Sequence, residues 1–585
     1  NVLSGLAKEA NIYFEFSTNE KVAMEVAATA AASGLRSFTF MKHVGMNVAS
    51  DSFMTTAYSG VNGGMVILSA DDPSLFSSQN EQDTRNYGRL ANVPILEPSN
   101  CQEVKDMVKY AFDLSEQFKL PVIVRTTTRV SHMRGVVEFG EVVDNSSEGE
   151  SHWKKGFFKK NPAQFVPVPA FAKDMHVALV EKMDEINKIT NESDFNVESY
   201  FSQNKKYGVI ASSSAYNYAY DVIRYNNLDI DVLKLGFSYP FPYDKVADFV
   251  KDYDEVFIVE EVDPIIEKDT LVAIGKNSLN TVVHGKLDGT FPVYHEFNSD
   301  IVANGFNKYL NFIEENTDDY SDNLLNLQEE IPSRAPVLCA GCPHRAMYYG
   351  VNKALEELGI PLKDAVFASD IGCYTLGINP PYNAADYLLS MGSSVGDGCG
   401  FSIATNQKVI SFIGDSTFFH SGISPLINAV HNKNNFILTV LDNRITAMTG
   451  GQPNPGIPVD GMGDDAPEIS IRKLALACGC NYVRVINPLN LDQVVKTYKE
   501  ALERDEVCVI IAKAPCTLIK GKTRKPPVNY IDSNCNGCNK CVNELACPAI
   551  SKDSGKIAID SSMCDGCGVC IQVCKYGALE AGRGE

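Results

Sequence analysis

The segment Val409-Ile410-Ser411-Phe412-Ile413-Gly414-Asp415-Ser416 has the apolar run of a buried β-strand and ends in a Gly-Asp turn. A second apolar run, 436–441, leads into Asp442-Asn443-Arg444, so that Asn443 follows Asp415 by 28 residues. Open α/β sheets bind ligands beyond the carboxyl ends of their strands. A carboxylate and an amide oxygen at two such ends suit Mg²⁺, which commonly shares its ligands with a diphosphate. The sequence therefore predicts a Mg²⁺–diphosphate site, which the backbone of Gly414 can approach because it has no Cβ.

A second chemistry is indicated by eight cysteines in the last 51 residues, arranged as Cys535-x2-Cys538-x2-Cys541-x5-Cys547-Pro548 and Cys564-x2-Cys567-x2-Cys570-x3-Cys574. Three thiolates two residues apart can surround one face of a [4Fe–4S] cluster, while the fourth reaches the other cluster. We therefore expect one cluster on Cys535, Cys538, Cys541 and Cys574, and another on Cys547, Cys564, Cys567 and Cys570. Structural zinc sites are the alternative, but they favour two-plus-two spacing. The pattern resembles a bacterial two-cluster ferredoxin, apart from the five residues before Cys547 and Lys575 after Cys574.

Composition excludes several classes of protein. With 585 residues the chain is too long for one hydrophobic core, and three to five domains are expected. A net charge of −21 argues against binding to nucleic acid, whose phosphates it would repel. There is no apolar run of about 18 residues, so no membrane-spanning helix is expected, and the start shows no signal peptide. Cysteines grouped for metal ligation favour a reducing compartment, and we expect a cytoplasmic protein.

Apolar runs that alternate with helical periodicity predict a multidomain α/β fold. Residues 1–140 and 335–518 have the pattern of open parallel sheets, and 204–320 forms a further α/β unit. Residues 141–203 are expected to be a linker region with one helix, and 528–585 a two-cluster ferredoxin domain of the α+β type.

The Gly-Asp-x27-Asn spacing resembles the thiamin diphosphate motif. Other segments resemble the large (alpha) subunit of the indolepyruvate:ferredoxin oxidoreductase family, within the thiamin-diphosphate-dependent 2-oxoacid:ferredoxin oxidoreductases. These segments are 19–23, 41–47, 77–83, 339–345, 370–377, 391–392, 412–423 and 443–453. The resemblance covers nearly the whole chain and is weakest over 141–203 and 265–330. The family's opening strand and its Tyr-Pro-Gly-Thr-Pro segment do not precede Asn1, so we expect a truncated N-terminus or a segment placed elsewhere.

The resemblance also implies roles for domains and residues. Residues 1–140 would bind the pyrimidine, 335–518 the diphosphate, and 204–320 would resemble the C-terminal domain of transketolase. Glu20 would be the carboxyl group at pyrimidine N1′, and His43 a proton-transfer or substrate-carboxylate residue. The Mg²⁺ ligands would be Asp415, Asn443 and Ile445. The cofactor-binding residues would be Cys342, His344, Asp370, Ile371, Gly372, Cys373, Met391, Gly392, Gly414, Asp415, Ser416, Asn443 and Ile445.

Alternatives remain open for several of these residues. Sequence alone would favour a helix-surface position for Glu20, and the match to the family's motif reverses this preference, whereas His43 is equally compatible with a hydrophobic core. Cys339 and Cys342 form a CxxC pair, typical of redox or zinc sites, but no second such pair lies nearby outside the ferredoxin module. We therefore favour a place in the wall of the cofactor pocket.

The activity implied by the resemblance is oxidative decarboxylation of aryl 2-oxoacids to aryl-acetyl-CoA and CO2, with reduction of ferredoxin. It implies thiamin diphosphate, Mg²⁺, two [4Fe–4S] clusters and coenzyme A as co-substrate. A smaller beta subunit would be the partner, in a dimer of heterodimers used for anaerobic amino-acid catabolism. The alternatives are another 2-oxoacid:ferredoxin oxidoreductase, a non-oxidative thiamin-dependent decarboxylase, or a non-catalytic electron-transfer subunit.

Overall fold

A computed structural model describes residues 2–140, 155–313, 331, 336–519, 521, 523–553 and 555–582. The chain divides into two compact units. The N-terminal unit is Asn19–Asn323, and the C-terminal unit combines Asn1–Thr18 with Leu324–Glu585. No helix of the described residues is long and apolar enough to cross a membrane.

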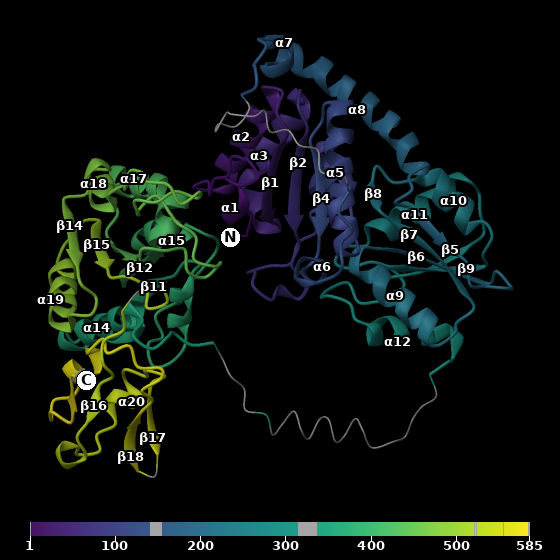
Figure 1. Cartoon of the computed structure of the whole chain (residues 1–585). Helices are drawn as coiled ribbons and strands as arrows, with labels where there is room; N and C mark the ends of the chain where they lie inside the picture. The colour runs from purple at the N-terminus through teal and green to yellow at the C-terminus, as the bar shows by residue number, and fades with distance from the viewer. Residues whose placement is uncertain are drawn as a thin grey trace. The chain divides into compact units, whose positions relative to one another are not determined.

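The first sheet of the N-terminal unit has the strand order β1-β2-β4-β3-β8. Strands β1 (Ser37–Lys42), β2 (Met65–Ala70), β4 (Val122–Thr126) and β3 (Ile95–Leu96) are parallel, and β8 (Phe237–Tyr239) is antiparallel to β3. The main helices around it are α2 (Glu20–Ala32), α3 (His43–Ser59) and α5 (Cys101–Phe118) (Figure 1), together with α4 (Arg85–Ala91). Both β2 and β4 are almost wholly buried, which explains their continuous apolar runs.

The region expected to be a linker contributes to this first core. It contains α7 (Pro162–Phe165) and the long helix α8 (Pro169–Asn191), while residues 141–154 lie outside the described part of the chain. Leu179, Met183 and Ile186 of α8 are buried in the same core as β2 and β4. Helix α8 is thus packed onto the first sheet domain along an apolar stripe.

The second sheet of this unit has the order β10-β9-β6-β7-β5. Strands β6 (Tyr207–Ser212), β7 (Ile230–Leu235), β9 (Glu255–Val259) and β10 (Val282–His284) are parallel, and β5 (Val197–Ser199) is an antiparallel edge strand. Helices α9 (Ser213–Tyr225), α10 (Tyr243–Val250), α11 (Ile265–Lys276) and α12 (Ser299–Leu310) complete the domain.

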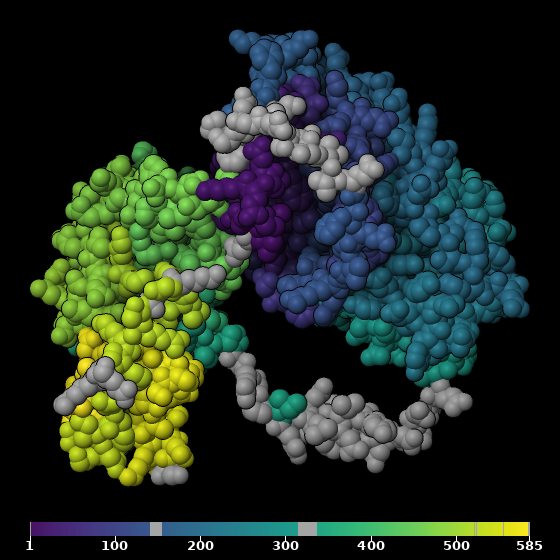
Figure 2. Space-filling model, in the orientation of Figure 1, coloured from purple at the N-terminus to yellow at the C-terminus, as the bar shows by residue number. Residues whose placement is uncertain are grey.

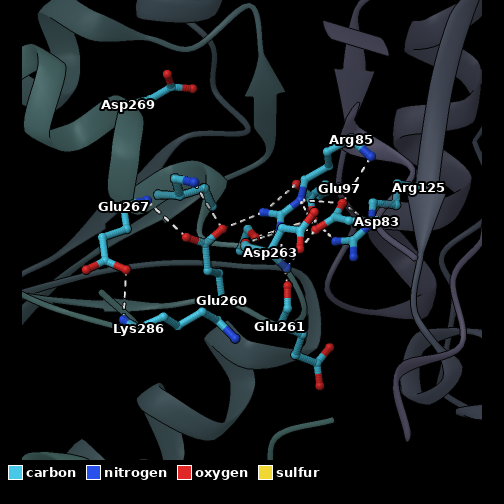
Figure 3. Close-up of polar contacts among 12 residues, drawn as sticks. Asp83, Arg85, Glu97, Arg125, Glu260, Glu261, Asp263, Glu267, Asp269 and Lys286 are labelled. Atoms are coloured by element: carbon cyan, nitrogen blue, oxygen red, sulfur yellow. Dashed lines mark hydrogen bonds and ion pairs between the residues drawn. The ribbon is translucent and has the colours of Figure 1, made fainter. Parts of the chain in front are cut away.

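Two buried arginines lie where the two sheet domains of the N-terminal unit meet, and Arg85 connects the domains (Figure 3). Arg85 donates to both carboxylate oxygens of Asp83 and, at 2.7 Å, to Glu260 at the end of β9. Arg125 donates to Asp71 at 2.6 Å and to Glu97 at 2.7 Å. Burial opposes the charge on Arg85, but the surrounding carboxylates raise its pKa well above the ordinary value. We call these residues, Asp71, Asp83, Arg85, Glu97, Arg125 and Glu260, the arginine clamp.

The C-terminal unit is built on a parallel sheet of order β11-β12-β13-β15-β14. Its strands are β11 (Ala365–Ala368), β12 (Lys408–Gly414), β13 (Ile437–Asp442), β15 (Cys508–Lys513) and β14 (Tyr482–Ile486). Its larger helices are α14 (Pro343–Glu357), α15 (Ser393–Ala404), α17 (Ile423–His431), α18 (Ile471–Ala477) and α19 (Leu491–Leu502). Two separate apolar clusters line the sheet, as expected for an α/β domain with helices on both faces.

The cysteine-rich C-terminal domain packs directly on this sheet domain (Figure 2). It contains two small antiparallel pairs, β16 (Asn529–Tyr530) with β19 (Leu579–Glu580) and β17 (Ile550–Asp553) with β18 (Lys556–Ile559). Its helices α20 (Lys540–Asn543) and α21 (Val569–Val573) are short. Ala346 of α14 and Leu491 of α19 belong to its hydrophobic core. The predicted multidomain α/β fold class is confirmed.

Candidate active site

The predicted Mg²⁺ ligands lie at two adjoining strand ends of the C-terminal unit. Strands β12 and β13 are paired in parallel with Gly414 opposite Leu441, so Asp415 and Asn443 follow neighbouring strands. Asp415 is buried and accepts hydrogen bonds from the backbone N–H groups of Ser416 at 2.8 Å and Arg444 at 3.0 Å. Burial, and then the nearby carboxylate of Asp442, raise the pKa of Asp415 to about 7. A buried carboxylate held in this way suits a hard cation, which would restore its charge.

The backbone around Asn443 turns sharply, which places polar groups at this edge. Arg444 has a left-handed φ of 65°, and Asn443 accepts a hydrogen bond from Ile445 N–H at 3.2 Å. Asn443 is itself buried and lies 3.5 Å from Nε2 of His344. The structure thus brings together Asp415, Asn443 and His344, three of the residues expected to hold cofactor or metal.

His344 is the second residue of α14 and is fully enclosed. Its Nδ1 is buried and has no hydrogen-bond partner among the described residues. Burial lowers the pKa of His344 to about 4, so its imidazole is neutral at pH 7. Burial also raises the pKa of the neighbouring Cys342 thiol to about 12. The polar atom left unpartnered at His344 is consistent with a ligand at this edge.

Asp370 organises the adjoining loops. One of its carboxylate oxygens accepts hydrogen bonds from Ile371 and Gly392 N–H, both at 2.8 Å, and the other accepts one from Ser394 N–H at 3.0 Å. Burial raises its pKa to about 6. Asp370 therefore holds the Met391–Gly392 turn and the start of α15 in place. Gly392 has a φ of 91°, and a Cβ there would lie 2.4 Å from Ser421, so only glycine fits without strain.

Glu20 and His43 lie in the N-terminal unit, at the carboxyl end of β1. Glu20 is the first residue of α2, which Asn19 caps by accepting a hydrogen bond from Val22 N–H at 2.9 Å. A Cβ on Gly45 would lie 2.7 Å from Cγ of Glu20, so the half-buried Glu20 side chain lies against the start of α3. His43 begins α3, is fully buried, and its Nε2 contacts the carbonyl of Asn80 at 3.1 Å. The two residues therefore occupy one sheet edge.

The eight cysteines of the C-terminal domain line two separate cavities. One is lined by Cys547, Cys564, Cys567 and Cys570, and the other by Cys535, Cys538, Cys541 and Cys574. Each cavity thus takes one cysteine from the opposite repeat, and four thiols are the donors that a [4Fe–4S] cluster requires. Within the described ranges, no three His, Cys, Asp or Glu side chains are spaced to share a single metal ion.

Three residues near the Mg²⁺ edge were missed by sequence reasoning. Asn454 donates to Asp415 at 3.1 Å, and Asp442 raises the pKa of Asp415. Cys516 donates its N–H to the Asn443 carbonyl at 2.9 Å. Only Asp442 had a visible signal, since it precedes Asn443 at the strand end. Asn454 lies in the loop that follows Asn443, and Cys516 lies in the segment after β15, but the spacing of the motif marks neither residue.

Three family models match segments of this chain. Residues 4–202 match the family model described as pyruvate flavodoxin/ferredoxin oxidoreductase, thiamine diphosphate-binding. Residues 370–512 match the C-terminal TPP-binding domain of thiamine pyrophosphate enzymes, and 527–575 match a 4Fe-4S dicluster domain. The chain contains thiamin-diphosphate-binding domains and an iron–sulfur domain.

Full-length relatives share one name, indolepyruvate oxidoreductase subunit IorA. The protein of Methanothermobacter marburgensis is 55% identical over 586 residues, covering 99% of this chain and 92% of the relative. That of Methanothermobacter thermautotrophicus is 55% identical, with the same coverage. That of Pyrococcus horikoshii is 41% identical over 608 residues, covering 100% of this chain and 92% of the relative. The chain is an enzyme of the 2-oxoacid:ferredoxin oxidoreductase type, and it belongs to the indolepyruvate oxidoreductase subunit IorA family.

Proposed function

We propose that this chain, together with a smaller beta subunit, oxidatively decarboxylates indolepyruvate and other arylpyruvates. The products are the aryl-acetyl-CoA and CO2, and the electrons reduce ferredoxin. The observation that carries this proposal is the packing of a two-cluster domain on a thiamin-diphosphate-binding domain. The cavity of Cys547, Cys564, Cys567 and Cys570 is also lined by Gly341, Cys342 and Arg345, which lie beside His344.

The residues at the sheet edges would have separate roles in binding the cofactor and in handling protons. Asp415, Asn443 and Ile445 would hold Mg²⁺ and, through it, the diphosphate. Asp370 would keep the Met391–Gly392 turn shaped for the same group. When bound there, thiamin diphosphate would supply the nucleophilic chemistry that decarboxylation of a 2-oxoacid requires. Glu20 would hold a proton at pyrimidine N1′, and His43 would orient the substrate carboxylate or move a proton to it.

The proposal also assigns a role to each domain and a composition to the assembly. We assign 1–140 to pyrimidine binding, 204–320 to a transketolase-C-terminal-like domain, 335–518 to diphosphate binding and 528–585 to the clusters. The cluster ligands are the two interleaved cysteine sets. Coenzyme A is the co-substrate, and the assembly is a dimer of heterodimers in the cytoplasm of an anaerobic cell that degrades amino acids.

The test is a substrate panel on the purified complex under anaerobic conditions, with viologen as electron acceptor. Indolepyruvate, phenylpyruvate and hydroxyphenylpyruvate should support CoA-dependent viologen reduction, whereas pyruvate and 2-oxoglutarate should be poor substrates. A preference for either small oxoacid would instead indicate another 2-oxoacid oxidoreductase. CO2 release that needs neither CoA nor acceptor would indicate a non-oxidative decarboxylase. Absence of bound thiamin would indicate an electron-transfer subunit.

A further inference from the structure

A buried arginine stands at the wall of one cysteine cavity. Arg345 is the third residue of α14 and is only 5% exposed. It lines the cavity of Cys547, Cys564, Cys567 and Cys570, which we call the inner cavity. The cavity of the other four cysteines, the outer cavity, is formed by residues of the C-terminal domain alone.

Carbonyl and hydroxyl oxygens of the described residues accept hydrogen bonds from the guanidinium of Arg345. It donates to the carbonyl of Leu545 at 3.2 Å, to the hydroxyl of Tyr382 at 2.9 Å, and to the carbonyls of Leu338 and Ala546. Its Nε is buried without a partner, and no carboxylate of the described residues forms an ion pair with it. Ala546 immediately precedes the cluster ligand Cys547, so these contacts fix the cation beside the inner cavity.

Carbonyl and hydroxyl dipoles solvate a buried cation but leave its charge uncompensated, which is unfavourable in a protein interior. A [4Fe–4S] cluster with four thiolate ligands is an anion, and reduction adds one more negative charge. Reduction potentials of such clusters depend on nearby charge and on solvent exposure. A fixed positive charge at the inner cavity therefore favours the reduced cluster there.

The outer cavity has a different electrostatic surrounding. Its ligand Cys538 is exposed to solvent, and Lys540, its basic residue, is an exposed side chain paired with Glu544. Solvent and the paired carboxylate weaken the effect of this lysine. The inner cavity is therefore lined by a buried arginine without an ion-pair partner among the described residues and by the buried side chain of Asp565, whereas the outer cavity has neither.

We propose that Arg345 is the built-in counter-ion of the inner cluster and raises its reduction potential, so that electrons from the oxoacid enter there. This inference rests on the proposed function, because it requires clusters on the two cysteine sets. Each transfer moves one electron: the inner site would be reduced as the decarboxylated oxoacid is oxidised. Transfer from the inner to the lower-potential outer site would be uphill, and it would be driven by removal of the electron from the outer site to ferredoxin.

The experiment is a potentiometric titration of the full chain with its partner subunit, followed by EPR of both clusters. In Arg345→Gln, the reduced-to-oxidised ratio of the inner cluster at a fixed potential should fall at least about tenfold, or about 59 mV for one electron. The outer cluster should be unchanged. Arg345→Lys, which keeps the charge, should stay within about threefold of wild type. An unchanged inner potential in a fully loaded Arg345→Gln protein would overturn the proposal.

A matched control is Arg524→Gln. Arg524 is exposed and donates at 2.8 Å to the carbonyl of Ser562, two residues before the inner ligand Cys564. Solvent screens the charge of Arg524, so the reduced-to-oxidised ratio of the inner cluster in Arg524→Gln should change less than about twofold. A shift as large as that of Arg345→Gln would show that any nearby cation suffices, and the proposal would be wrong.

If Arg345→Gln does not load its clusters, the wild type still decides. Cys538→Ser alters the EPR signal of the outer cluster and so assigns the two signals. The unaltered signal should titrate at the higher potential in the wild type, and a lower potential would refute the role of Arg345. Iron analysis distinguishes a wrong role of Arg345 from wrong cluster ligands. A wild-type protein without iron would overturn the cluster ligands assigned under the proposed function.

Discussion

The chemical character of Asp415 comes from its burial at the end of β12. The carboxylate receives hydrogen bonds from two backbone N–H groups and from Asn454, yet burial and Asp442 still raise its pKa to about 7. Without a cation, Asp415 therefore changes its protonation state near neutral pH. Mg²⁺ would replace a proton on this carboxylate. Binding of the metal, and through it of the diphosphate, would therefore depend on the two carboxylate oxygens of Asp415.

We predict that Asp415→Ala loses thiamin diphosphate, with at least about a hundredfold weaker binding, because one anionic Mg²⁺ ligand is gone. Cluster absorbance should be unchanged, since the cysteine cavities contain no part of this strand end. Equilibrium dialysis with Mg²⁺ measures the cofactor. Asp505→Ala, at an exposed aspartate of the same unit, is the control and should bind normally. Normal binding by Asp415→Ala would place the metal elsewhere.

We expect Glu20 to activate the cofactor, whereas we expect Asp415 to hold it. Glu20→Gln keeps the shape of the side chain and cannot exchange a proton with N1′. We predict binding of thiamin diphosphate within a few-fold of wild type, and exchange of its C2 proton at least about 100-fold slower. Quenched hydrogen–deuterium exchange followed by NMR is the measurement.

Glu25→Gln provides the comparison for Glu20. Glu25 lies on the same helix, where it accepts a hydrogen bond from Ser52 at 2.9 Å and pairs with Lys21. Its variant should exchange the C2 proton at the wild-type rate. If Glu20→Gln exchanges normally and Glu25→Gln does not, the two roles must be reversed.

At the scale of elements, the arginine clamp joins the loop after β2 to the end of β9. Removing one partner from a buried ion pair leaves the others uncompensated, and this typically costs about 3–5 kcal/mol. We predict that Arg85→Met destabilises the N-terminal unit by this amount in urea unfolding. Arg36→Met is the control, because the half-exposed Arg36 pairs with Asp113 and Glu116 at the surface. Its loss should cost about 0–1 kcal/mol, and equal costs for both variants would contradict the argument.

The interleaved repeats form the other testable element. Cys574 lies in the second repeat but lines the cavity of Cys535, Cys538 and Cys541. We predict that Cys574→Ala abolishes or alters the EPR signal of that cluster, while the cluster of Cys564, Cys567 and Cys570 keeps its signal. Cys547→Ala should do the reverse. Loss of the signal belonging to the same repeat as the mutated cysteine would show that the sets are not interleaved.

Local patterns predicted the strands and the cysteine sets, and long-range partners could not be predicted. The apolar run at Val409–Ile413 forms the centre of β12, because a strand buried on both faces needs apolar side chains throughout. Arg85 and Glu260 are 175 residues apart, and in sequence each looks like an ordinary solvated charge. Asn454 is likewise brought to Asp415 by a loop. Motifs can be recognised from the spacing of residues in the sequence, whereas the partners of buried polar groups are set by the tertiary structure.

At the scale of the C-terminal unit, the cluster domain is fitted closely onto the sheet domain. A Cβ on Gly341 would lie 2.6 Å from the side chain of Asp565, and Gln572 bonds the backbone at Leu491 N–H and at the Leu489 carbonyl, at 2.9 and 2.8 Å. Arg345 adds its contacts to Leu545 and Ala546. Around the inner cavity, backbone of one domain is thus in direct contact with side chains of the other.

The close fit at Gly341 has a kinetic consequence. A carrier domain on a swinging tether must diffuse between two docking positions, and its rate falls as the medium thickens. Here the inner cavity already borders the sheet domain, so the cluster domain does not need to diffuse before an electron is transferred to it. Single-turnover reduction of the clusters should therefore be unaffected by glycerol or sucrose, whereas the later encounter with free ferredoxin should slow in proportion to viscosity. A viscosity-dependent first phase in stopped-flow absorbance would mean that the domain must move before it accepts an electron.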